Sequence, residues 1–320
     1  MAVYTEVSFD EAAALVARVG LGTLTSLTGI RSGIENTNYF ADTTQGVYVL
    51  TVFERLTFEQ LPFYLQLMKH LAGRGIPVPG PKADASGAIL HSLQGKPAAI
   101  VDRLRGSHRL APEATHCASL GATLARMHAA GADFAMHQPN LRGLPWWTET
   151  VPVVLPFVTD AQRALLEDEL MFQKHVAASP AHAALPRGAI HADLFRDNAM
   201  FDTTPAGDQL TGLFDFYFAG DDALLFDIAV CLNDWCIDLE SGRLDESRAS
   251  VLIAAYHTVR ALTPNERRLL PALMRAAAFR FWLSRLWDLH LPRDASLLTP
   301  HDPAHFERVL RSHIAAPWHA

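Results

Sequence analysis

The stretch AIHADLFRDNAMF, residues 189–201, is the most informative part of this chain. His191 is followed by Asp193 two residues later, and Asn198 comes five residues after that aspartate. Apolar residues stand on both sides of these polar ones, so we expect a loop held between two short strands. A second segment, Leu213-Phe214-Asp215-Phe216, brings a further carboxylate shortly afterwards.

The spacing H-x-D-x-x-x-x-N followed by an aspartate is typical of a phosphoryl-transfer site. A fixed carboxylate such as Asp193 can orient a hydroxyl group and accept its proton, which contributes roughly 10²- to 10⁴-fold in rate. Asn198 and Asp215 offer amide and carboxylate oxygens, which are the ligands that Mg²⁺ prefers. Each residue alone would more often be a turn former. The combined pattern, with apolar segments on both flanks, favours the catalytic interpretation.

Composition excludes several other classes of protein. With 320 residues, 49% of them hydrophobic and 19% charged, the chain is expected to be globular. The net charge of −7 argues against nucleic acid as a partner. Cys117, Cys231 and Cys236 show no C-x-x-C spacing, so neither a disulfide framework nor a zinc site is indicated. No apolar run approaches a membrane span and the N-terminal residues do not resemble a signal peptide, so we expect a soluble cytoplasmic protein.

The first third of the chain has the pattern of an antiparallel sheet with helices. We expect helices from Ser8 to Val19 and from Thr57 to Gly73, each opened by a capping box. Runs rich in β-branched and aromatic residues predict strands; they are 23–30, 37–42, 47–53, 89–93 and 97–101. The turn at residues 29–36 either covers phosphate groups or is a plain hairpin, since its two glycines are a weak signal.

The remainder reads as mainly helical. Residues 102–107 are polar and contain a glycine, so we place a linker there; a lobe of residues 1–102, a hinge of 103–107 and a helical lobe of 108–320 are expected. Apolar residues at helical spacing predict the helices; they are 112–128, 160–178, 223–238, 246–261, 265–290 and 303–314. Residues 131–156 are expected to be irregular. His128 is interpreted as a surface or capping histidine, and Asp227 as either a helix cap or a brace for the catalytic loop.

The order of these parts resembles the aminoglycoside phosphotransferase and choline kinase branch of the protein-kinase-like fold. That resemblance implies an α+β, two-lobe structure with an antiparallel-sheet N-lobe and a mainly helical C-lobe. Within the branch, four segments are similar to the bacterial homoserine kinases: 33-GIENTNYF-40, 48-YVLT-51, 191-HADLF-195 and 231-CLNDWC-236.

The resemblance implies ATP- and Mg²⁺-dependent phosphorylation of L-homoserine to O-phospho-L-homoserine, a step toward threonine. By position, Asp193 would be the base, His191 would support the loop, and Asn198 and Asp215 would bind magnesium. The nucleotide contacts implied in the same way lie in the first turn and the linker; they are Gly29, Arg31, Ser32, Gly33, Asp102 and Leu104.

One position departs from the wider fold. Thr51 stands where that fold has its phosphate-binding lysine, so the usual lysine–glutamate ion pair cannot be assigned. Arg31, Arg55 or Arg196 could supply the positive charge, and the sequence does not choose among them.

An amino-acid substrate carries an ammonium and a carboxylate, so we expect a paired acidic and basic recognition set. Arg280 lies on a polar stripe of an otherwise apolar helix, with Ser284 and Asp288. We expect Arg280 or Arg285 to bind the carboxylate. The candidates for the ammonium are Asp221, Asp222 and Asp234.

Two other interpretations remain open. The first is a kinase of another small alcohol: choline, a methylthioribose-like sugar or an aminoglycoside. Choline would favour an aromatic cage, for which the candidate walls are Trp146, Trp147, Trp235 and Trp282. The second, suggested by Thr51, is a catalytically inactive kinase-like binding protein. In either case the chain is expected to be a monomer or a small homo-oligomer.

Overall fold

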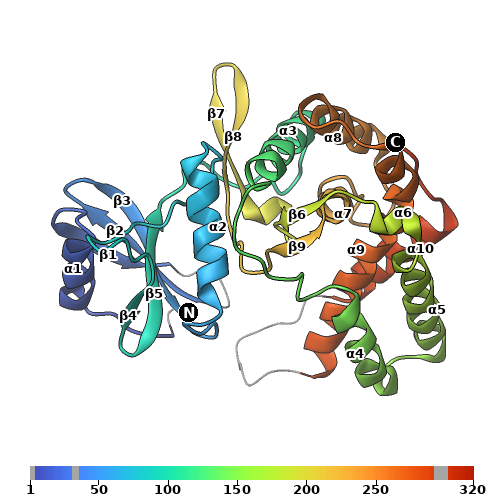
Figure 1. Ribbon diagram of the computed structural model, residues 1–320, viewed down its shortest axis with the longest axis horizontal. Coiled ribbons are helices and arrows are strands. Elements are labelled where there is room, and N and C mark those ends of the chain that lie inside the picture. Colours follow the sequence, from blue (N-terminus) through green and yellow to red (C-terminus); the bar gives the residue numbers. More distant parts are fainter. Residues whose placement is uncertain (1–3, 31–35, 292–301) are drawn as a thin grey trace. The chain divides into compact units, whose positions relative to one another are not determined.

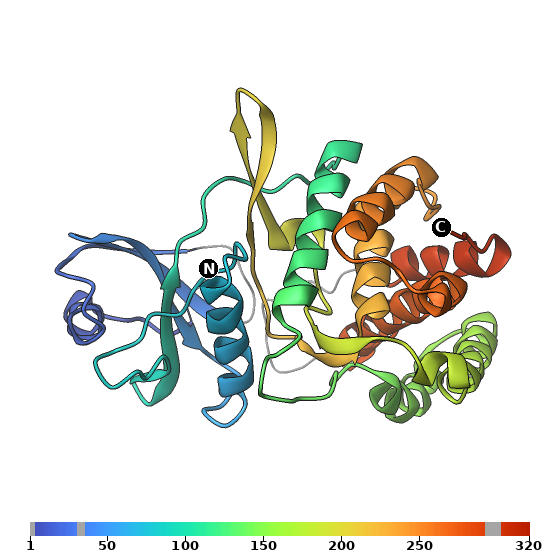
Figure 2. The ribbon, with the colours of Figure 1, turned by 45° about the horizontal axis from the view of Figure 1, so that its top comes forward.

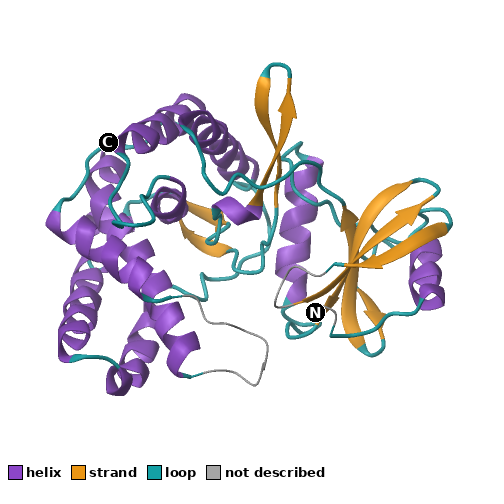
Figure 3. Ribbon diagram, turned by 180° about the vertical axis from the view of Figure 1, so that it is seen from behind, coloured by secondary structure: helices purple, strands orange, loops and turns teal. Residues whose placement is uncertain are grey.

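The structure is a computed structural model that describes residues 4–30, 36–291 and 302–320. The chain forms two compact units (Figure 1). Unit 1 comprises Met1–Arg105 with Thr211–Phe214, and unit 2 comprises Gly106–Leu210 with Asp215–Ala320. Figure 3 shows that most strands belong to the first unit and most helices to the second. The roles predicted for a nucleotide-binding lobe, a hinge and a substrate lobe stay predictions.

Unit 1 is built on an antiparallel sheet of five strands in the order β1-β2-β3-β5-β4. The strands are β1 (Leu24–Gly29), β2 (Asn36–Thr43), β3 (Gly46–Phe53), β4 (His91–Leu93) and β5 (Lys96–Asp102). Every second residue of β2 from Thr37 to Ala41 is buried, which is the period of a strand with one face in the core. The five strands predicted from the sequence are therefore confirmed.

Two helices accompany this sheet, α1 (Phe9–Arg18) and α2 (Leu61–Gly73), and Figure 1 shows them on opposite sides of it. The capping box predicted at Ser8 is present, and Glu11 completes it. The second helix begins later than predicted, at Leu61. Gln60 Oε1 accepts a hydrogen bond from Thr57 N, but residues 58–60 form a turn ahead of the helix.

Unit 2 is mainly helical. Its helices are α3 (Ala114–Ala130), α4 (Leu144–Val154), α5 (Asp160–Ala177), α6 (Pro180–Ala183), α7 (Leu224–Trp235), α8 (Glu246–Val259), α9 (Pro264–His290) and α10 (Ala304–Ala315), with short 3₁₀ turns η1 (Leu155–Phe157) and η2 (Arg196–Asn198). Two two-stranded sheets pair β6 (Arg187–Ile190) with β9 (Gly220–Ala223), and β7 (Ala199–Thr204) with β8 (Gly207–Leu213), whose last residues belong to unit 1. The strands predicted before and after the catalytic loop are β6 and β7.

Helix α7 is the centre of this unit, because each of its twelve residues is buried. Helices α3 and α8 lie side by side (Figure 2) and approach closely at Gly121. A Cβ atom at Gly121 would come within 2.3 Å of the Leu252 carbonyl oxygen, so only glycine allows this contact.

Two predictions for this unit are wrong. Residues 144–154, expected to be irregular, form α4: Pro145 stands in its first turn, where proline is tolerated, and Trp147 packs against Phe226 and Phe279. His128 is not at the surface but 3% exposed, within the core of the unit. Over the ranges that the structure describes, no helix has both the length and the apolar character needed to cross a membrane.

Candidate active site

The predicted catalytic loop, residues 191–198 and called the catalytic loop below, is held at its start by Asp227 of α7. One carboxylate oxygen of Asp227 accepts a hydrogen bond from His191 N and the other from Ala192 N, each at 2.8 Å. Of the two roles predicted for Asp227, the structure therefore supports the brace. The aspartate lies in the first turn of α7, but both of its oxygens are turned to the loop.

A second aspartate of the same helix holds the other end of the loop. Asp234 Oδ2 accepts hydrogen bonds from Arg196 N at 2.7 Å and from Arg196 Nε at 3.1 Å. Asp227 and Asp234 are seven residues apart, about two helical turns, so they lie on one face of α7. In the middle of the loop, Leu194 O accepts a hydrogen bond from Trp235 Nε1 of the same helix at 3.0 Å. The loop is thus attached to one buried helix along most of its length.

Ala192 and Asp215 have positive φ angles, which are uncommon for residues other than glycine. Their φ angles are +63° and +66°. The left-handed region costs a residue with a Cβ atom about 1–2 kcal/mol. Such strain persists only where surrounding contacts impose it, and Asp227 supplies one such contact at Ala192.

Asp227 has its own support in the core. His128 Nε2 donates to Asp227 Oδ2 at 3.1 Å, and Tyr256 Oη lies 2.7 Å from His128 Nδ1. Burial by itself would raise the pKa of Asp227. The hydrogen bond and charge of His128, together with His191, outweigh it, so the pKa lies below the ordinary aspartate value. Asp227 is therefore held ionised behind the loop.

Asp193, the predicted base, is half-buried. Its backbone N–H donates to His191 Nδ1 at 3.3 Å, which fits the supporting role predicted for His191. Asn198 Nδ2 donates to the Asp193 carbonyl oxygen at 2.8 Å. Arg280 Nη1 lies 3.8 Å from Asp193 Oδ1, so a cation from α9 faces this carboxylate. The loop thus presents Asp193 and Asn198 together.

Asp215 is placed beside the same loop by its neighbour Phe216. The Phe216 ring is fully buried and lies 4.4 Å, centroid to centroid, from the His191 ring. Asn198 donates through its amide nitrogen toward Asp193, and its role as a metal ligand stays a prediction. An amide oxygen and a carboxylate suit Mg²⁺ chemically.

Among the described residues there is no group of three or more His, Cys, Asp or Glu side chains that could hold a metal ion. A magnesium ion at Asn198 and Asp215 would therefore take its other ligands from water and from the phosphate groups of a nucleotide. That is the usual way in which this ion is bound with a substrate phosphate.

The arginines predicted for the substrate carboxylate differ in their surroundings. Arg280 is 3% exposed, and its Nε has no hydrogen-bond partner. Burial lowers its pKa to about 10, with Asp193 opposing and Arg142 and Arg285 adding to the shift. Arg285 is half-buried with its guanidinium 4.7 Å from the Phe306 ring centroid, and burial lowers its pKa as well.

The three candidates for the ammonium already have partners. Asp234 is occupied by Arg196, as described above. Asp222 contacts Asn140 Nδ2 and Arg187 Nη2, both at 2.9 Å. Asp221 lies 2.9 Å from Nδ1 of His137, an exposed side chain. Asp234 and Asp222 therefore hold parts of the protein together, which disfavours them as substrate ligands.

The predicted nucleotide contacts that the structure describes lie in unit 1. Gly29 ends β1, and Asp102 ends β5 with Lys82 Nζ 2.6 Å from its carboxylate. Leu104 packs closely against Gly212. The other three predicted contacts, Arg31, Ser32 and Gly33, lie outside the described residues.

The structure places Thr51, which stands where the wider fold has its phosphate-binding lysine. Thr51 lies close to the end of β3, and its hydroxyl group donates to Asn38 Oδ1 at 2.7 Å. Of the three arginines that could replace the lysine, Arg196 is committed to Asp234 and is disfavoured. Arg55 is exposed, and Arg31 lies outside the described residues.

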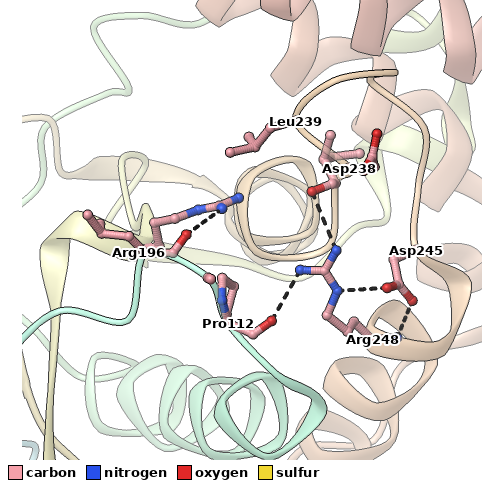
Figure 4. Close-up of a pocket in the computed structure, with 9 residues that line it drawn as sticks. Pro112, Arg196, Asp238, Leu239, Asp245 and Arg248 are labelled. Carbon is pink, nitrogen blue, oxygen red and sulfur yellow. Dashed lines mark hydrogen bonds and ion pairs between the residues drawn. The ribbon is translucent and has the colours of Figure 1, made fainter.

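A pocket of about 520 Å³ opens beside Arg196 (Figure 4). Its two arginines are used by the protein: Arg196 donates to Leu110 O at 2.9 Å, and Arg248 contacts Asp245 at 2.9 Å and Pro112 O at 3.3 Å. The arginines join residues 110–112 to the loop and to the end of α7. The pocket is a structural junction rather than part of the candidate site.

Several contributors to this site were missed from the sequence. His128 and Tyr256 support Asp227 from helices α3 and α8, and Arg142 and Phe218 lie close to Arg280. Among these residues, only His128 carries a sequence signal: its place near the end of a predicted helix. That place indicates a surface or capping histidine, not support for Asp227.

Comparison with known proteins gives consistent results. Residues 26–262 match the Phosphotransferase enzyme family. The homoserine kinase of Polaromonas naphthalenivorans (strain CJ2) is 67% identical over 318 residues, which cover 99% of each chain. That of Janthinobacterium sp. (strain Marseille) is 54% identical, over 98% of this chain and 96% of its own.

Solved structures share the fold at low sequence identity. An amicoumacin kinase in complex with AMP-PNP, Ca²⁺ and Ami superposes with a TM-score of 0.69 at 18% identity, covering 95% of this chain and 93% of its own. These findings confirm the predicted α+β fold of the aminoglycoside phosphotransferase and choline kinase branch.

Proposed function

Because the chain belongs to the Phosphotransferase enzyme family, and within it to the homoserine kinases, we propose that it transfers the γ-phosphoryl group of ATP to the hydroxyl group of L-homoserine. The products are O-phospho-L-homoserine and ADP. The observation that carries the proposal is the 67% identity to a homoserine kinase over 99% of both chains. The arrangement of the catalytic loop supports it.

Asp193 is proposed to orient the substrate hydroxyl and to accept its proton as the new P–O bond forms. Its position depends on the braces at His191 and Ala192 and on Arg196, which fix the loop before a substrate arrives. Such fixed geometry removes part of the entropic barrier to the reaction. Arg280 Nη1, 3.8 Å from Asp193 Oδ1, places a positive charge beside this carboxylate.

The proposal includes Mg²⁺ bound by Asn198 and Asp215, where it would offset the charge of the phosphate groups. The nucleotide is proposed to contact unit 1 through Gly29, Asp102 and Leu104 and through the turn at residues 31–33. Arg31 or Arg55 is proposed to supply the positive charge that Thr51 does not. The enzyme is proposed to act in the cytoplasm as a monomer or a small homo-oligomer.

For the substrate, the carboxylate is proposed to bind Arg280 or Arg285 and the ammonium Asp221. Among the three aspartates considered, Asp221 is preferred because its contact is with an exposed histidine. Exchange of that contact for a substrate ammonium would cost less than breaking a buried ion pair.

A panel of alcohols tests the reaction. The purified protein is incubated with ATP, Mg²⁺ and, separately, L-homoserine, choline, methylthioribose and an aminoglycoside, and phosphorylated products are measured. We expect phosphohomoserine to be formed with the highest kcat/KM. Preference for another alcohol would reject the substrate, and nucleotide binding without turnover of any alcohol would reject the enzyme.

A further inference from the structure

A second pocket of unit 2 is lined by three arginines and shares no residue with the candidate active site. Its volume is about 480 Å³, which is within the usual range of small-molecule sites. It lies between α10 and residues 236–245, the segment that joins α7 to α8 and is called the α7–α8 loop below. The polar residues that line it are Ser241, Arg243, Arg308, Arg311 and Ser312.

Helix α10 presents its share of the pocket on one face. Arg308, Arg311 and Ser312 follow one another at i, i+3 and i+4, so their side chains point to the same side of the helix. The charge of Arg311 is offset by Glu307, whose Oε1 lies 2.8 Å from Arg311 Nη2. Arg308 is exposed, and its side chain makes no hydrogen bond or ion pair with another residue in the described ranges.

The α7–α8 loop is ordered by its own hydrogen bonds. Asp238 Oδ1 accepts from Ser241 N at 2.8 Å and from Ser241 Oγ at 2.6 Å, and these bonds hold the pKa of Asp238 below the ordinary aspartate value. Gly242 N donates to Asp238 O at 2.9 Å, and Arg243 N donates to Ser241 Oγ at 3.3 Å. The backbone of Arg243 is therefore fixed. Its side chain, like that of Arg308, has no such partner within the part of the chain that the structure describes.

Gly242 lets the loop pack directly against α10. Its φ angle is +71°, and a Cβ atom at this position would lie 2.8 Å from Arg308 Cβ and 3.0 Å from Val309 N. A larger residue would thus be both strained and too close to the helix. The two walls of the pocket are in contact without a ligand, so binding costs little additional ordering of the backbone.

The charges of the pocket are not balanced by the residues that line it. Basic residues in the second half of α10 offset the negative end of the helix dipole, which accounts for Arg308 and Arg311. It does not account for Arg243, which comes from another element and lines the same pocket. Positive charges gathered in a concave site attract anions more strongly than the same charges spread over a surface.

We propose that this pocket binds a phosphate group of a small anion through Arg243, Arg308 and Ser312, and that the bound group holds α10 against the α7–α8 loop. A phosphate group carries up to two negative charges and three acceptor oxygens, which suits donors that come from two elements. A planar carboxylate is satisfied by a single arginine. The net charge of −7 disfavours a nucleic acid as the source of the phosphate.

Helix α10 connects this pocket to the catalytic loop. The rings of Phe306 and Phe195 are stacked with their centroids 5.9 Å apart, and Phe195 belongs to the loop. Further along the helix, His313 Nε2 lies 2.8 Å from Asn233 Oδ1 of α7. An anion that holds α10 in place therefore also supports the contact between Phe306 and the loop.

Calorimetric titration tests the binding. Orthophosphate, pyrophosphate and malonate are titrated into the full-length protein with ADP and Mg²⁺ present, so that the proposed nucleotide site is occupied. We expect pyrophosphate to bind most tightly and malonate, a dicarboxylate, at least about tenfold more weakly. Arg243→Gln and Arg308→Gln should each raise the Kd for pyrophosphate about 10- to 100-fold, the usual range for the loss of a charged hydrogen bond.

Two further ligands distinguish the sources of the phosphate group. O-phospho-L-serine represents a phosphorylated amino acid, and AMP represents a nucleotide. The ligand that binds more tightly identifies the source, and either preference supports the phosphate subsite.

Amide hydrogen exchange locates the bound anion. With pyrophosphate, exchange should slow in residues 236–245 and 304–316 of the wild-type protein and stay unchanged there in Arg308→Gln. The melting temperature of wild type should rise with pyrophosphate concentration, because a ligand that binds the folded state stabilises it.

Arg268→Gln is the matched control, because Arg268 is an exposed arginine of α9 whose side chain donates to Asn265 Oδ1 at 3.1 Å. It should bind pyrophosphate as wild type does. Thermal unfolding without ligand checks the fold of each variant. Arg243→Gln, which changes a loop residue, carries the test if Arg308→Gln does not fold.

Four results would overturn the inference. They are the absence of binding to either phosphate at up to about 10 mM, equal affinity for malonate, a Kd that is unchanged in both pocket variants or raised equally in Arg268→Gln, and slowed exchange only outside the two segments. None of them touches the proposed function, because phosphorylation of homoserine is not measured in these experiments.

Discussion

The two ends of the catalytic loop are held by aspartates of the same helix, but in different ways. At the first brace, Asp227 accepts two backbone N–H groups and is backed by His128 and Tyr256. At the second brace, Asp234 accepts one backbone N–H group and the side chain of Arg196. The pKa of Asp227 is lowered, whereas that of Asp234 is raised.

The two pKa shifts differ in direction because the two carboxylates have different sets of hydrogen-bond donors. Burial raises the pKa of Asp234, and Arg196 does not offset it; the charge of Asp197 adds to the shift. Arg196 also donates to Leu110 O and to the Asp234 carbonyl oxygen, so its charge is shared among several acceptors. At Asp227, three donors point at the two carboxylate oxygens. A buried carboxylate is thus stabilised by the set of its donors, not by the presence of an opposite charge alone.

Removing the first brace should have the largest effect. Asp227→Ala leaves two backbone N–H groups of a strained loop and His128 without their acceptor. Breaking a buried charged contact of this kind costs about 3–5 kcal/mol. We expect kcat with homoserine to fall by more than about 100-fold, because Asp193 is no longer held in position, and denaturant unfolding measures the stability.

The control for that variant is Asp238→Ala, which removes an exposed aspartate just after α7 whose partner is Ser241. It should leave kcat unchanged. If Asp227→Ala kept wild-type kcat in the folded protein, the first brace would not position Asp193.

Removing the second brace should cost less. In Asp234→Asn the amide oxygen still accepts one hydrogen bond from Arg196, so we expect kcat to fall only about tenfold, as for the loss of one charged hydrogen bond. Steady-state kinetics with homoserine measures the change. A larger loss of kcat than in Asp227→Ala would reverse the ranking of the two braces.

The opposite pKa shifts predict opposite dependences of stability on pH. Asp227, with a lowered pKa, contributes stability above the unfolded aspartate value, and this contribution is lost as pH falls through its folded pKa. Asp234, with a raised pKa, binds its proton more readily in the folded state, so its contribution improves as pH falls through that raised value.

Unfolding free energies of wild type, Asp227→Asn and Asp234→Asn are therefore compared between pH 8 and the acid limit of folding. The advantage of wild type over Asp227→Asn should shrink toward acid, and its advantage over Asp234→Asn should grow. Slopes of the same sign for both variants would show that the pKa values of the two carboxylates are not shifted in opposite directions.

The smallest effect is expected at Ala192. Glycine there removes the clash of a Cβ atom at φ +63° and should stabilise the protein by up to about 1 kcal/mol, less the added entropy of the unfolded chain. Ala254→Gly, at an exposed position of α8, should instead destabilise it by about 1 kcal/mol. Equal losses in the two variants would mean that the first brace holds no strain.

The positions of the loop, the flanking strands and most helices could be predicted, because each depends on local spacing or periodicity. Helix α4 could not be predicted, because Pro145 and Pro152 both suggest that no helix forms there. In the structure, Pro145 stands in the first turn of the helix, where proline is tolerated. The sequence predicts a surface or capping role for His128, because its partner, Asp227, is 99 residues away and leaves no local signal. Arg142 was missed for a similar reason: only the folded segment brings it to Phe218. Side-chain pairs of this kind leave no periodic trace in a sequence.

The complete burial of α7 has a consequence for how this protein could change its substrate. Side chains that hold the reaction geometry are part of the hydrophobic interior, so altering them damages folding and turnover together. The segment around Arg142 is anchored mainly through Asn140 and Trp147, and its neighbouring side chains are partly accessible. Redesign toward new alcohols should therefore randomise residues 141–146 and leave the central helix untouched.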